Sequence, residues 1–515
     1  CMKLVNKMVF NTIDPEVDIA EMQKSAQFYP DEELVFFDIE VFPNLFVVAF
    51  KHYHDTKKTI WINPSQQQIE SLIQMPLVGF NNRDYDNHVL YAAFLGEPLE
   101  KLYHISQGII AGNPNAKFGS AYELSYADIY EYSSDKKSLK KWEIELSTVD
   151  HDELGLPWDQ PVPEELWERV GEYCGNDVDA TEALFDHIYY DYTARKIIAT
   201  LSGLKVNAKT TQHSAKFLFG DDPRPQDKFI YTDLSKEFPG YEYSFGKSTY
   251  KGIDTGNGGA VYSEPGVYSN VALLDIASQH PRSAIVLKYF GPYAQRFEDL
   301  VDTRVLVKHG DYEAAAKMFN GILIPFLQDK QSAKDLAYAL KIIINIIYGM
   351  TSASFDNKFR HKDNHDNIIA KRGALFMLEL KEQVQNMGFT VAHIKTDSIK
   401  IPDATQEIID FVFWFGKQYG YTFEHEHTYA RMALVNKAVY IAQVEDGSWE
   451  ATGPMFAQPF VYKTPFSHEE MYEQDYAVTM EVKGAAIHLG EKFIGRIVQV
   501  YASRTGEEMW RVTPD

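Results

Sequence analysis

The chain has 515 residues and carries 50 Lys and Arg against 73 Asp and Glu, a formal net charge of −23 with neutral histidines. The length suggests about three domains, and 45% hydrophobic and 14% aromatic residues exclude a disordered chain. No apolar run reaches the ~18 residues of a membrane helix, and we expect no secretory signal. With only two cysteines, a disulfide framework and a cysteine-based zinc site are excluded, and a reducing compartment fits.

The first half of the chain predicts a mixture of strands and helices. Two strands are expected within residues 34–50, where apolar runs flank Pro43-Asn44. Helices are expected over residues 66–77, 86–96 and 163–198. Residues 239–259 are rich in Gly, Ser, Tyr and Thr, which predicts a linker.

The second half continues with an apolar strand over residues 270–276 and a long helical stretch over 296–353. A hairpin is expected over 390–401 and a helix near 404–420. The last ~60 residues mix helix and strand signals.

A set of acidic residues accompanies the elements of the first half. Asp38 and Glu40 lie two apart near the end of an apolar strand, so both point to one face. Asp86 opens a predicted helix, and Tyr173 and Asp177 share a face of a later one. Four carboxylates from three elements could converge on two divalent cations, as phosphodiester hydrolysis requires. The alternative is that they belong to solvated faces; for Asp128, which follows on another segment, we expect a structural role.

A second acidic pair lies in the second half of the chain. Asp275 ends the apolar strand and is followed by Ser278 and His280, and Asp397 lies in the turn of the predicted hairpin. Two carboxylates from neighbouring strands could hold two metal ions for nucleotidyl transfer. Taken alone, Asp397 would be an ordinary turn residue.

Polar and basic residues between these two aspartates share helical faces. Lys341, Asn345 and Tyr348 fall on one face of a predicted helix, and Arg304 and Lys308 are four apart on another. Three cations on two facing helices suit a triphosphate. Without the rest of the pattern, each would be an ordinary amphipathic face.

The motifs of both sets, in this order, resemble known enzymes. D-x-E, N-x3-Y-D and Y-x3-D resemble the proofreading 3′–5′ exonucleases. D-x2-S-x-x-P, K-x3-N-x2-Y-G and T-D-S resemble motifs A, B and C of family B DNA polymerases, most closely the bacteriophage members. The resemblance spans roughly residues 34–445.

The resemblance implies a role for each motif residue. Metal ligands for Mg²⁺, two ions per site with Mn²⁺ as the alternative, would be Asp38, Glu40, Asp86, Asp177, Asp275 and Asp397. Tyr173 would orient the attacking water. Residues implied in dNTP binding are Arg304, Lys308, Lys341, Asn345, Tyr348, Ser278 and His280. Residues implied in DNA binding are Tyr250, Gly252, Lys437 and Tyr440.

The implied fold class is α/β and α+β, with an RNase H-like exonuclease domain followed by a right-hand polymerase. The expected ranges are an exonuclease domain over 1–205, a template-contact linker over 206–265, palm over 266–296, fingers over 297–364, palm over 365–445 and a short or partial thumb over 446–515. Expected partners are primer–template DNA, dNTPs and other replication proteins, but no membrane. The resemblance further implies a monomeric viral protein in the host cytoplasm.

Two departures from the family keep alternatives open. Lys395 stands where motif C usually has its first Asp, and His280 stands where motif A has a tyrosine beneath the incoming sugar. The segment after Tyr440 is also short for a thumb. One alternative is therefore a 3′–5′ exonuclease whose polymerase half has decayed, and another is a non-enzymatic replication scaffold that only holds DNA.

Overall fold

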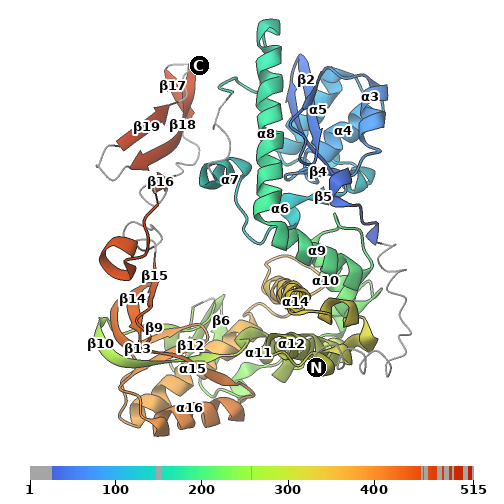
Figure 1. The fold of residues 1–515 in the computed structure, drawn as a ribbon. Helices are drawn as coiled ribbons and strands as arrows, with labels where there is room; N and C mark the ends of the chain where they lie inside the picture. Colours follow the sequence, from blue (N-terminus) through green and yellow to red (C-terminus); the bar gives the residue numbers. More distant parts are fainter. Residues whose placement is uncertain are drawn as a thin grey trace.

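The computed structural model describes residues 26–146, 154–256, 258–453, 456 and 462–472, together with four strands between residues 478 and 512. These residues form two large units that each mix helices with a sheet, and a C-terminal sheet (Figure 1). The predicted mixed α/β, multidomain character is confirmed. Within the described residues, no helix is long and apolar enough to cross a membrane.

The first unit is built on a five-stranded sheet in the order β3-β2-β1-β4-β5. Its strands are β1 (Val35–Phe42), β2 (Leu45–His52), β3 (Thr59–Ile62), β4 (Leu77–Gly79) and β5 (Ala127–Asp128). β1, β2 and β3 are antiparallel neighbours, whereas β4 runs parallel to β1 and β5 parallel to β4. The two strands predicted within residues 34–50 are confirmed, and the second continues to His52.

Helices cover both faces of this sheet. They are α3 (Gln66–Leu72), α4 (Asp86–Phe94), α5 (Leu99–Ile110), α6 (Ile129–Tyr132), α7 (Leu139–Leu146), α8 (Trp167–His187) and α9 (Tyr189–Ser202). Phe37 of β1 belongs to the core under α4 and α5, and its neighbour Phe36 belongs to the core under α8. The prediction of one helix over 163–198 is wrong in detail, because the backbone leaves the helical region at Ile188. The helix predicted over 66–77 ends at Leu72, since Pro76 and β4 follow.

The second unit is built on a seven-stranded antiparallel sheet in the order β15-β14-β13-β10-β12-β11-β9. Its strands are β9 (Val261–Ser263), β10 (Gly266–Ile276), β11 (His393–Lys395), β12 (Ser398–Pro402), β13 (Phe423–Asn436), β14 (Val439–Val444) and β15 (Trp449–Thr452). The strand and hairpin predicted over 270–276 and 390–401 are confirmed. The sheet also takes β9 from the range expected to be a linker and β15 from the range expected to be a thumb.

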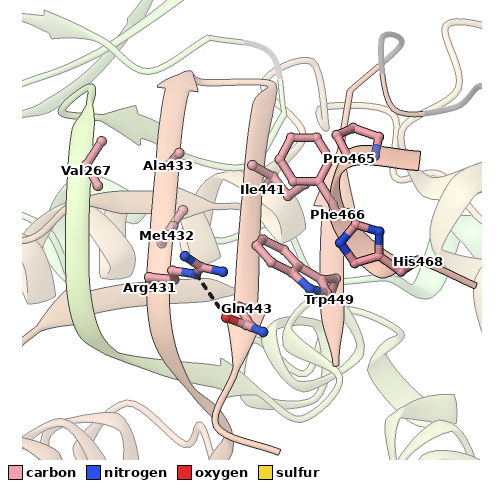
Figure 2. A pocket seen from close by; sticks show the side chains of 10 residues that line it. All are labelled: Val267, Arg431, Met432, Ala433, Ile441, Gln443, Trp449, Pro465, Phe466 and His468. Carbon is pink, nitrogen blue, oxygen red and sulfur yellow. Dashed lines mark hydrogen bonds between the residues drawn. The ribbon is translucent and has the colours of Figure 1, made fainter. Parts of the chain in front are cut away.

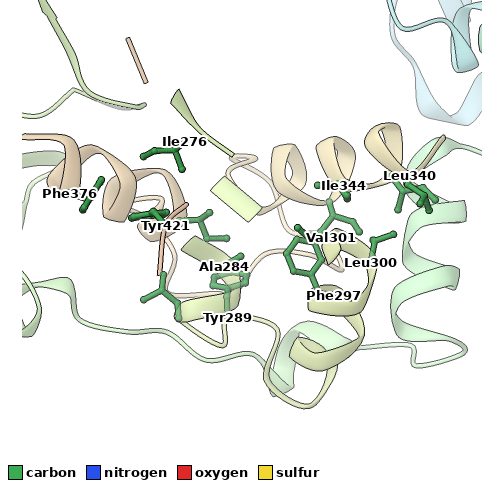
Figure 3. Close-up of a cluster of buried hydrophobic side chains, with 14 of the residues drawn as sticks. Ile276, Ala284, Tyr289, Phe297, Leu300, Val301, Leu340, Ile344, Phe376 and Tyr421 are labelled. Atoms are coloured by element: carbon green, nitrogen blue, oxygen red, sulfur yellow. The ribbon is translucent and has the colours of Figure 1, made fainter. Parts of the chain in front are cut away.

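The helices of the second unit enclose the largest core of the described residues (Figure 3). They are α10 (Thr210–Phe219), α11 (Gln279–Val286), α12 (Ala294–Lys308), α13 (Tyr312–Ala316), α14 (Lys330–Thr351), α15 (Ile368–Asn386) and α16 (Gln406–Gln418). The single helical stretch predicted over 296–353 is wrong between α12 and α14. There Gly310 and the left-handed Phe319 and Asn320 break the helix, and Pro325 lies in a further short turn.

The linker predicted over 239–259 is also wrong. Those residues form a small antiparallel sheet of β6 (Tyr241–Ser244), β7 (Lys247–Tyr250) and β8 (Ile253–Asp254). The glycines that suggested a linker instead form the tight turns, with φ of 78° at Gly246 and 79° at Gly252. Tyr241 and Tyr250 are buried in the main core, so the sheet is anchored to the second unit.

The two large units meet where α9 packs against α14 (Figure 1). The hydroxyl of Tyr338 on α14 donates a hydrogen bond to Asp191 Oδ1 on α9 at 2.6 Å. The other oxygen of Asp191 accepts from the backbone N–H of Ser134 at 2.8 Å, and the carboxylate is buried. One carboxylate thus joins α14 to the first unit.

The C-terminal sheet contains β16 (Val478–Met480), β17 (Ala486–Leu489), β18 (Lys492–Ala502) and β19 (Glu508–Val512). β18 pairs antiparallel with each of the other three. A short helical segment, Lys463–Ser467, precedes it. The mixture of helix and strand predicted for this end of the chain is confirmed for the described part.

Candidate active sites

Three of the predicted metal ligands meet between the first sheet and α8. Asp38 and Glu40 lie on β1 and Asp177 lies on α8, which packs against that strand. One carboxylate oxygen from each lies within 4.8 Å of the others. We call Asp38, Glu40, Asp177 and the neighbouring Asp86 the first centre. The sequence prediction that the two β1 carboxylates share a face agrees with this geometry.

Asp86 is the first residue of α4 and its side chain is buried. Its negative charge raises the pKa of both Asp38 and Glu40, so its carboxylate is close enough to influence the ionisation of both groups. Burial, followed by the charge of Asp128, raises the pKa of Asp86 itself to about 7, against hydrogen bonds from backbone N–H groups. Asp86 therefore acts electrostatically on this group, whereas Asp38, Glu40 and Asp177 are the three that lie within 4.8 Å of one another.

The first centre is electrostatically crowded. Burial first, and then the neighbouring carboxylates, raise the pKa of Asp38 well above its ordinary value and that of Glu40 to about 8. Burial also raises the pKa of Asp177 to about 6, against the charge of Lys140. Buried carboxylates ionise fully only when cations compensate them. An all-oxygen donor set of this kind fits Mg²⁺ or Mn²⁺.

Lys140 on α7 is a functional candidate that the sequence reasoning missed. Its Nζ lies 2.7 Å from Asp177 Oδ1 and 3.3 Å from Glu143 Oε1. The same Nζ lies 4.6 Å from the centroid of the Tyr173 ring. A lysine on an amphipathic helix gives no sequence signal of its own, and only the packing of α7 on α8 places it here.

Two further side chains of α8 face the first centre. Burial and the charge of Asp177 raise the pKa of Tyr173 above its ordinary value, so its hydroxyl stays protonated and can donate. The buried thiol of Cys174 donates to Asp38 Oδ2 at 3.5 Å, a contact the sequence reasoning did not foresee. Asp128 accepts from the backbone N–H groups of Asn81 and Arg83, both at 2.9 Å, so its expected structural role is confirmed.

Asp275 and Asp397 come together at one end of the second sheet, and we call them the second centre. Asp275 on β10 pairs in register with Ser398 on β12, next to Asp397 in the β11–β12 turn. The N–H of Ile276 donates to the carbonyl of Asp397 at 2.9 Å. Burial and then the charge of Asp397 raise the pKa of Asp275 to about 7, and burial raises that of Asp397.

Unusual backbone conformations surround the second centre. Thr396 and Ser278 are left-handed, with φ of 58° and 60°. Gln279 Nε2 donates to the Thr396 carbonyl at 2.9 Å, and a Cβ at Gly259 would lie 2.7 Å from Thr396 Cγ2. Non-glycine residues in this region cost free energy, and such strain collects at functional sites.

Charged residues that the sequence reasoning left out also lie near the second centre. Lys400 on β12 is only 2% exposed, and burial lowers its pKa to about 8. Its Nζ lies 5.0 Å from the centroid of the Tyr440 ring. Glu424 and Glu426 on β13 add negative charge that acts on Asp275. None of the three belongs to a motif of the sequence analysis.

The predicted nucleotide-binding residues lie on neighbouring elements. Arg304 and Lys308 are on α12, and Lys341, Asn345 and Tyr348 are on α14, which packs against α12. Lys308, Lys341 and Asn345 are exposed.

His280 is linked to this group through α14. Its ring, at the start of α11, stacks on the Tyr348 ring with centroids 4.2 Å apart and 8° between planes. The motif A and motif B residues are thereby joined across two helices. Burial lowers the pKa of His280 to about 4, so the stacked imidazole is neutral.

The predicted DNA-contact residues fall in two places. Tyr250 is buried and donates to Glu379 Oε2 at 2.7 Å, while Gly252 lies in the β7–β8 turn. Lys437 is exposed in the β13–β14 turn, and Tyr440 lies on β14. Their role in DNA binding stays a prediction.

A pocket of about 390 Å³ lies on the outer strands of the second sheet, and its lining includes none of the predicted site residues (Figure 2). The Arg431 guanidinium lies 5.0 Å from the Trp449 ring centroid and donates to Gln443 Oε1 at 2.9 Å. Phe466 and His468 close the pocket from the segment after β15.

No family model matches the chain. One curated protein with local similarity is the DNA polymerase zeta catalytic subunit of Schizosaccharomyces pombe, 30% identical over 119 residues. The match takes in 22% of this chain, which spans only 7% of that protein's length. Among solved structures, the family B DNA polymerase from the hyperthermophilic archaeon Pyrobaculum calidifontis is similar at a TM-score of 0.45 and 16% identity, over 83% of this chain and 61% of that one.

Proposed function

We propose that the protein is a template-directed DNA polymerase that also has 3′–5′ proofreading exonuclease activity. The observation that carries the proposal is the presence of two carboxylate centres in separate units, three carboxylates within 4.8 Å in one and Asp275 beside Asp397 in the other. One centre suits hydrolysis of a primer end and the other its extension, so errors made at the second can be removed at the first. The local similarity to a DNA polymerase catalytic subunit supports this proposal.

The donor sets of both centres fit Mg²⁺, with Mn²⁺ as the alternative. The ligands would be the four carboxylates of the first centre and the two aspartates of the second, because all six offer the carboxylate oxygens that Mg²⁺ prefers. Two bound cations per centre would stabilise both the attacking and the leaving oxygen of phosphoryl transfer.

At the first centre, the chain's own residues would orient a water molecule and offset charge. The protonated Tyr173 hydroxyl would hold the water that attacks the terminal phosphodiester. The water oxygen bonds to phosphorus while the bond from phosphorus to the penultimate 3′-oxygen breaks, which releases a nucleoside monophosphate. Lys140, 2.7 Å from Asp177, would neutralise part of the added negative charge.

At the second centre, the primer 3′-hydroxyl would attack the α-phosphorus of a dNTP. The new bond joins the primer oxygen to that phosphorus, the bond to the bridging oxygen breaks, and pyrophosphate leaves. Arg304, Lys308 and Lys341 would bind the triphosphate and neutralise charge that develops during transfer. The His280–Tyr348 stack would lie beneath the sugar, with Ser278 and Asn345 beside the nucleotide.

The remaining parts of the proposal concern architecture and setting. We propose that an RNase H-like exonuclease domain precedes the palm, fingers and thumb of a polymerase. Tyr250, Gly252, Lys437 and Tyr440 would contact primer–template DNA. The protein would act as a monomer in bacteriophage DNA replication in the host cytoplasm, alongside other replication proteins.

A second candidate function is a 3′–5′ exonuclease without polymerase activity, which Lys395 at the motif C position favours. A primer-extension assay on primed template, with and without dNTPs and with and without EDTA, separates the two. The proposal requires metal-dependent lengthening with dNTPs and shortening without them. Shortening under both conditions would favour the nuclease, and neither activity would contradict both candidates.

A further inference from the structure

The turn of the β6–β7 hairpin carries a phenylalanine that the turn itself does not favour. Ser244 pairs with Lys247, so Phe245 and Gly246 form a two-residue turn. Both are left-handed, with φ of 49° and 78°, as a hairpin turn of this length requires. Asparagine or glycine adopts this conformation at little cost, whereas it is rare and strained for a bulky residue. Burial does not offset the strain, because the Phe245 side chain is fully exposed.

The hairpin beneath this ring is fixed to the rest of the second unit. The Tyr241 hydroxyl donates to Asp366 Oδ2 at 2.8 Å, and the Tyr243 hydroxyl donates to the carbonyl of His365 at 3.3 Å. Tyr241 is also buried in the main core, together with its strand partner Tyr250. The hairpin therefore presents the exposed ring from an anchored base, and a group that stacks on the ring has little main-chain freedom to restrict.

A polar cavity of about 400 Å³ lies between the hairpin and the adjoining ends of α14 and α15. Gly246 of the turn lines it, together with Ser352, the C-cap of α14, and Asn367, the N-cap of α15. Ser352 follows Tyr348 by four residues, which is about one helical turn. The cavity therefore extends from the hairpin turn to within about one helical turn of the residue that stacks on His280.

Basic side chains accompany the exposed ring. Lys247 follows the turn directly and is exposed. Lys371 lines the cavity, where its Nζ donates to a neutral partner, Thr255 Oγ1, at 3.1 Å. The carboxylate in the same lining, that of Asp366, accepts from two tyrosine hydroxyl groups at 3.2 and 2.8 Å. An exposed aromatic ring with cations beside it is the combination that binds a single nucleic-acid strand.

We propose that Phe245 is a stacking platform for an unpaired base of the template strand on its way to the second centre. The inference rests on the proposed function, because a polymerase meets the template ahead of the primer as a single strand. Stacking on an aromatic ring tolerates any base, which suits a strand of variable sequence. Phe245 belongs to no motif of the sequence analysis, and it differs from Tyr250, which is buried and bonded to Glu379.

Binding of a primed template with a single-stranded 5′ overhang tests the inference without relying on activity. The full chain carries Asp38→Ala with Glu40→Ala so that the primer stays intact, and affinity is measured by fluorescence anisotropy. Phe245→Ala should weaken binding fivefold or more, whereas Phe245→Trp, which keeps an aromatic face, should stay within twofold. The control Ile253→Ala removes another exposed apolar side chain from the same small sheet and should also stay within twofold.

The variant Phe245→Asn separates stacking from a structural role of the ring. Asparagine suits the left-handed turn, so the melting temperature should be unchanged or higher, while binding should weaken as much as in Phe245→Ala. A lower melting temperature together with weaker binding in Phe245→Asn would overturn the inference, because the ring would then support the fold.

An abasic residue moved stepwise through the overhang locates the stacked base. With Phe245 present, one position should weaken binding by threefold or more, and Phe245→Asn should be insensitive there. Equal affinity of the two proteins, or the same abasic profile in both, would contradict the platform even if the protein extends primers. Overhang binding that depends on Phe245, in a protein that extends no primer with both centres intact, would support the platform and count against the proposed function instead.

Discussion

The two carboxylate centres are assembled by different structural routes. The first gathers carboxylates from β1, α4 and α8, so it exists only when a sheet and two helices pack correctly. The second takes its aspartates from β10 and the β11–β12 turn, where strand register alone brings them together. The first therefore depends on tertiary packing, and the second depends on a few backbone hydrogen bonds within one sheet.

Each centre also has its own lysine, and the two lysines are held differently. Lys140 is 29% exposed and in direct contact with Asp177 at 2.7 Å. Lys400 is 2% exposed, and its Nζ lies 3.4 Å from the hydroxyl of Ser398. The first lysine is partly exposed to solvent, whereas the second is enclosed by the sheet. Under the proposed function, we therefore expect metal binding to displace a lysine side chain at the first centre and not at the second.

The largest effect is expected when the carboxylates of the first centre are substituted, which tests whether the two centres carry separate activities. Asp38→Ala together with Glu40→Ala should abolish 3′–5′ degradation, because the first centre would lose two of its four proposed cation ligands. Primer extension should stay largely intact, since Asp275 and Asp397 lie in another unit. The measurement is degradation of a single-stranded primer and extension of a primed template by the same preparation. Degradation at a near-normal rate would show that the activity belongs elsewhere.

The converse change breaks the second centre. Asp397→Asn should lower extension by several orders of magnitude while degradation survives, because an amide cannot replace the charge of a metal-binding carboxylate. Steady-state single-nucleotide insertion measures the loss. Asp410→Asn, on the exposed face of α16, is the matched control. Extension within tenfold of wild type for Asp397→Asn would assign the centre to another carboxylate.

The crowding of the first centre predicts how stability depends on pH without metal. Glu40 has its pKa raised to about 8 from about 4.5. Between these values the folded state binds more protons than the unfolded state, so the free energy of unfolding falls as pH rises. In EDTA, the melting temperature should fall from pH 5.5 to 8.5, and Mg²⁺ should reverse most of the loss at pH 8.5.

The variant Glu40→Gln sharpens this test, because it cannot gain a charge as pH rises. Its melting temperature in EDTA should depend less on pH than that of the wild type. Differential scanning fluorimetry of both proteins across the pH series measures the difference. Equal slopes would mean that Glu40 is not held protonated by its neighbours.

The smallest expected effect concerns sugar selection at the second centre. His280→Ala should raise incorporation of rNTP relative to dNTP by about tenfold, or ~1.4 kcal/mol, because under the proposed function the ring stacked on Tyr348 would limit the space for a 2′-hydroxyl. Matched rNTP and dNTP insertion is measured on one template in the Asp38→Ala, Glu40→Ala background. Tyr348→Phe, which keeps the stacked ring, should change the ratio less. An unchanged ratio for His280→Ala would leave the imidazole with packing alone.

The placement of candidate residues could be predicted from the sequence where they lie on a regular element. Asp38 and Glu40 lie two residues apart within an apolar strand, and Asp275 is the second-to-last residue of another. The small sheet of Tyr241–Asp254 was missed because its glycines indicate flexibility as readily as tight turns. The break between α12 and α14 was missed because the left-handed conformation that Phe319 adopts there is rare for a bulky residue.

Residues without a motif could not be found from sequence. Lys140 reaches Asp177 only because α7 packs on α8, and no spacing along the chain encodes that contact. The register shift between β10 and β13, which leaves Glu426 as an extra residue, is a bulge, and a bulge of this kind has no reliable letter pattern. These placements follow from packing and register, which the fold determines as a whole.

Tyr338 of α14 is hydrogen-bonded to the buried Asp191 of the first unit, so α14 is attached to that unit at this point. Tyr348 follows Tyr338 by ten residues, so it lies about 15 Å along the helix from that contact. A rotation of α14 by about 10° around this contact would therefore move Tyr348 by roughly 2.5 Å, whereas Tyr338 would hardly move. Asp191 also accepts a hydrogen bond from the backbone N–H of Ser134, which precedes α7, the helix of Lys140. A rotation of α14 around this contact would therefore be centred beside a residue of the unit that contains the first centre.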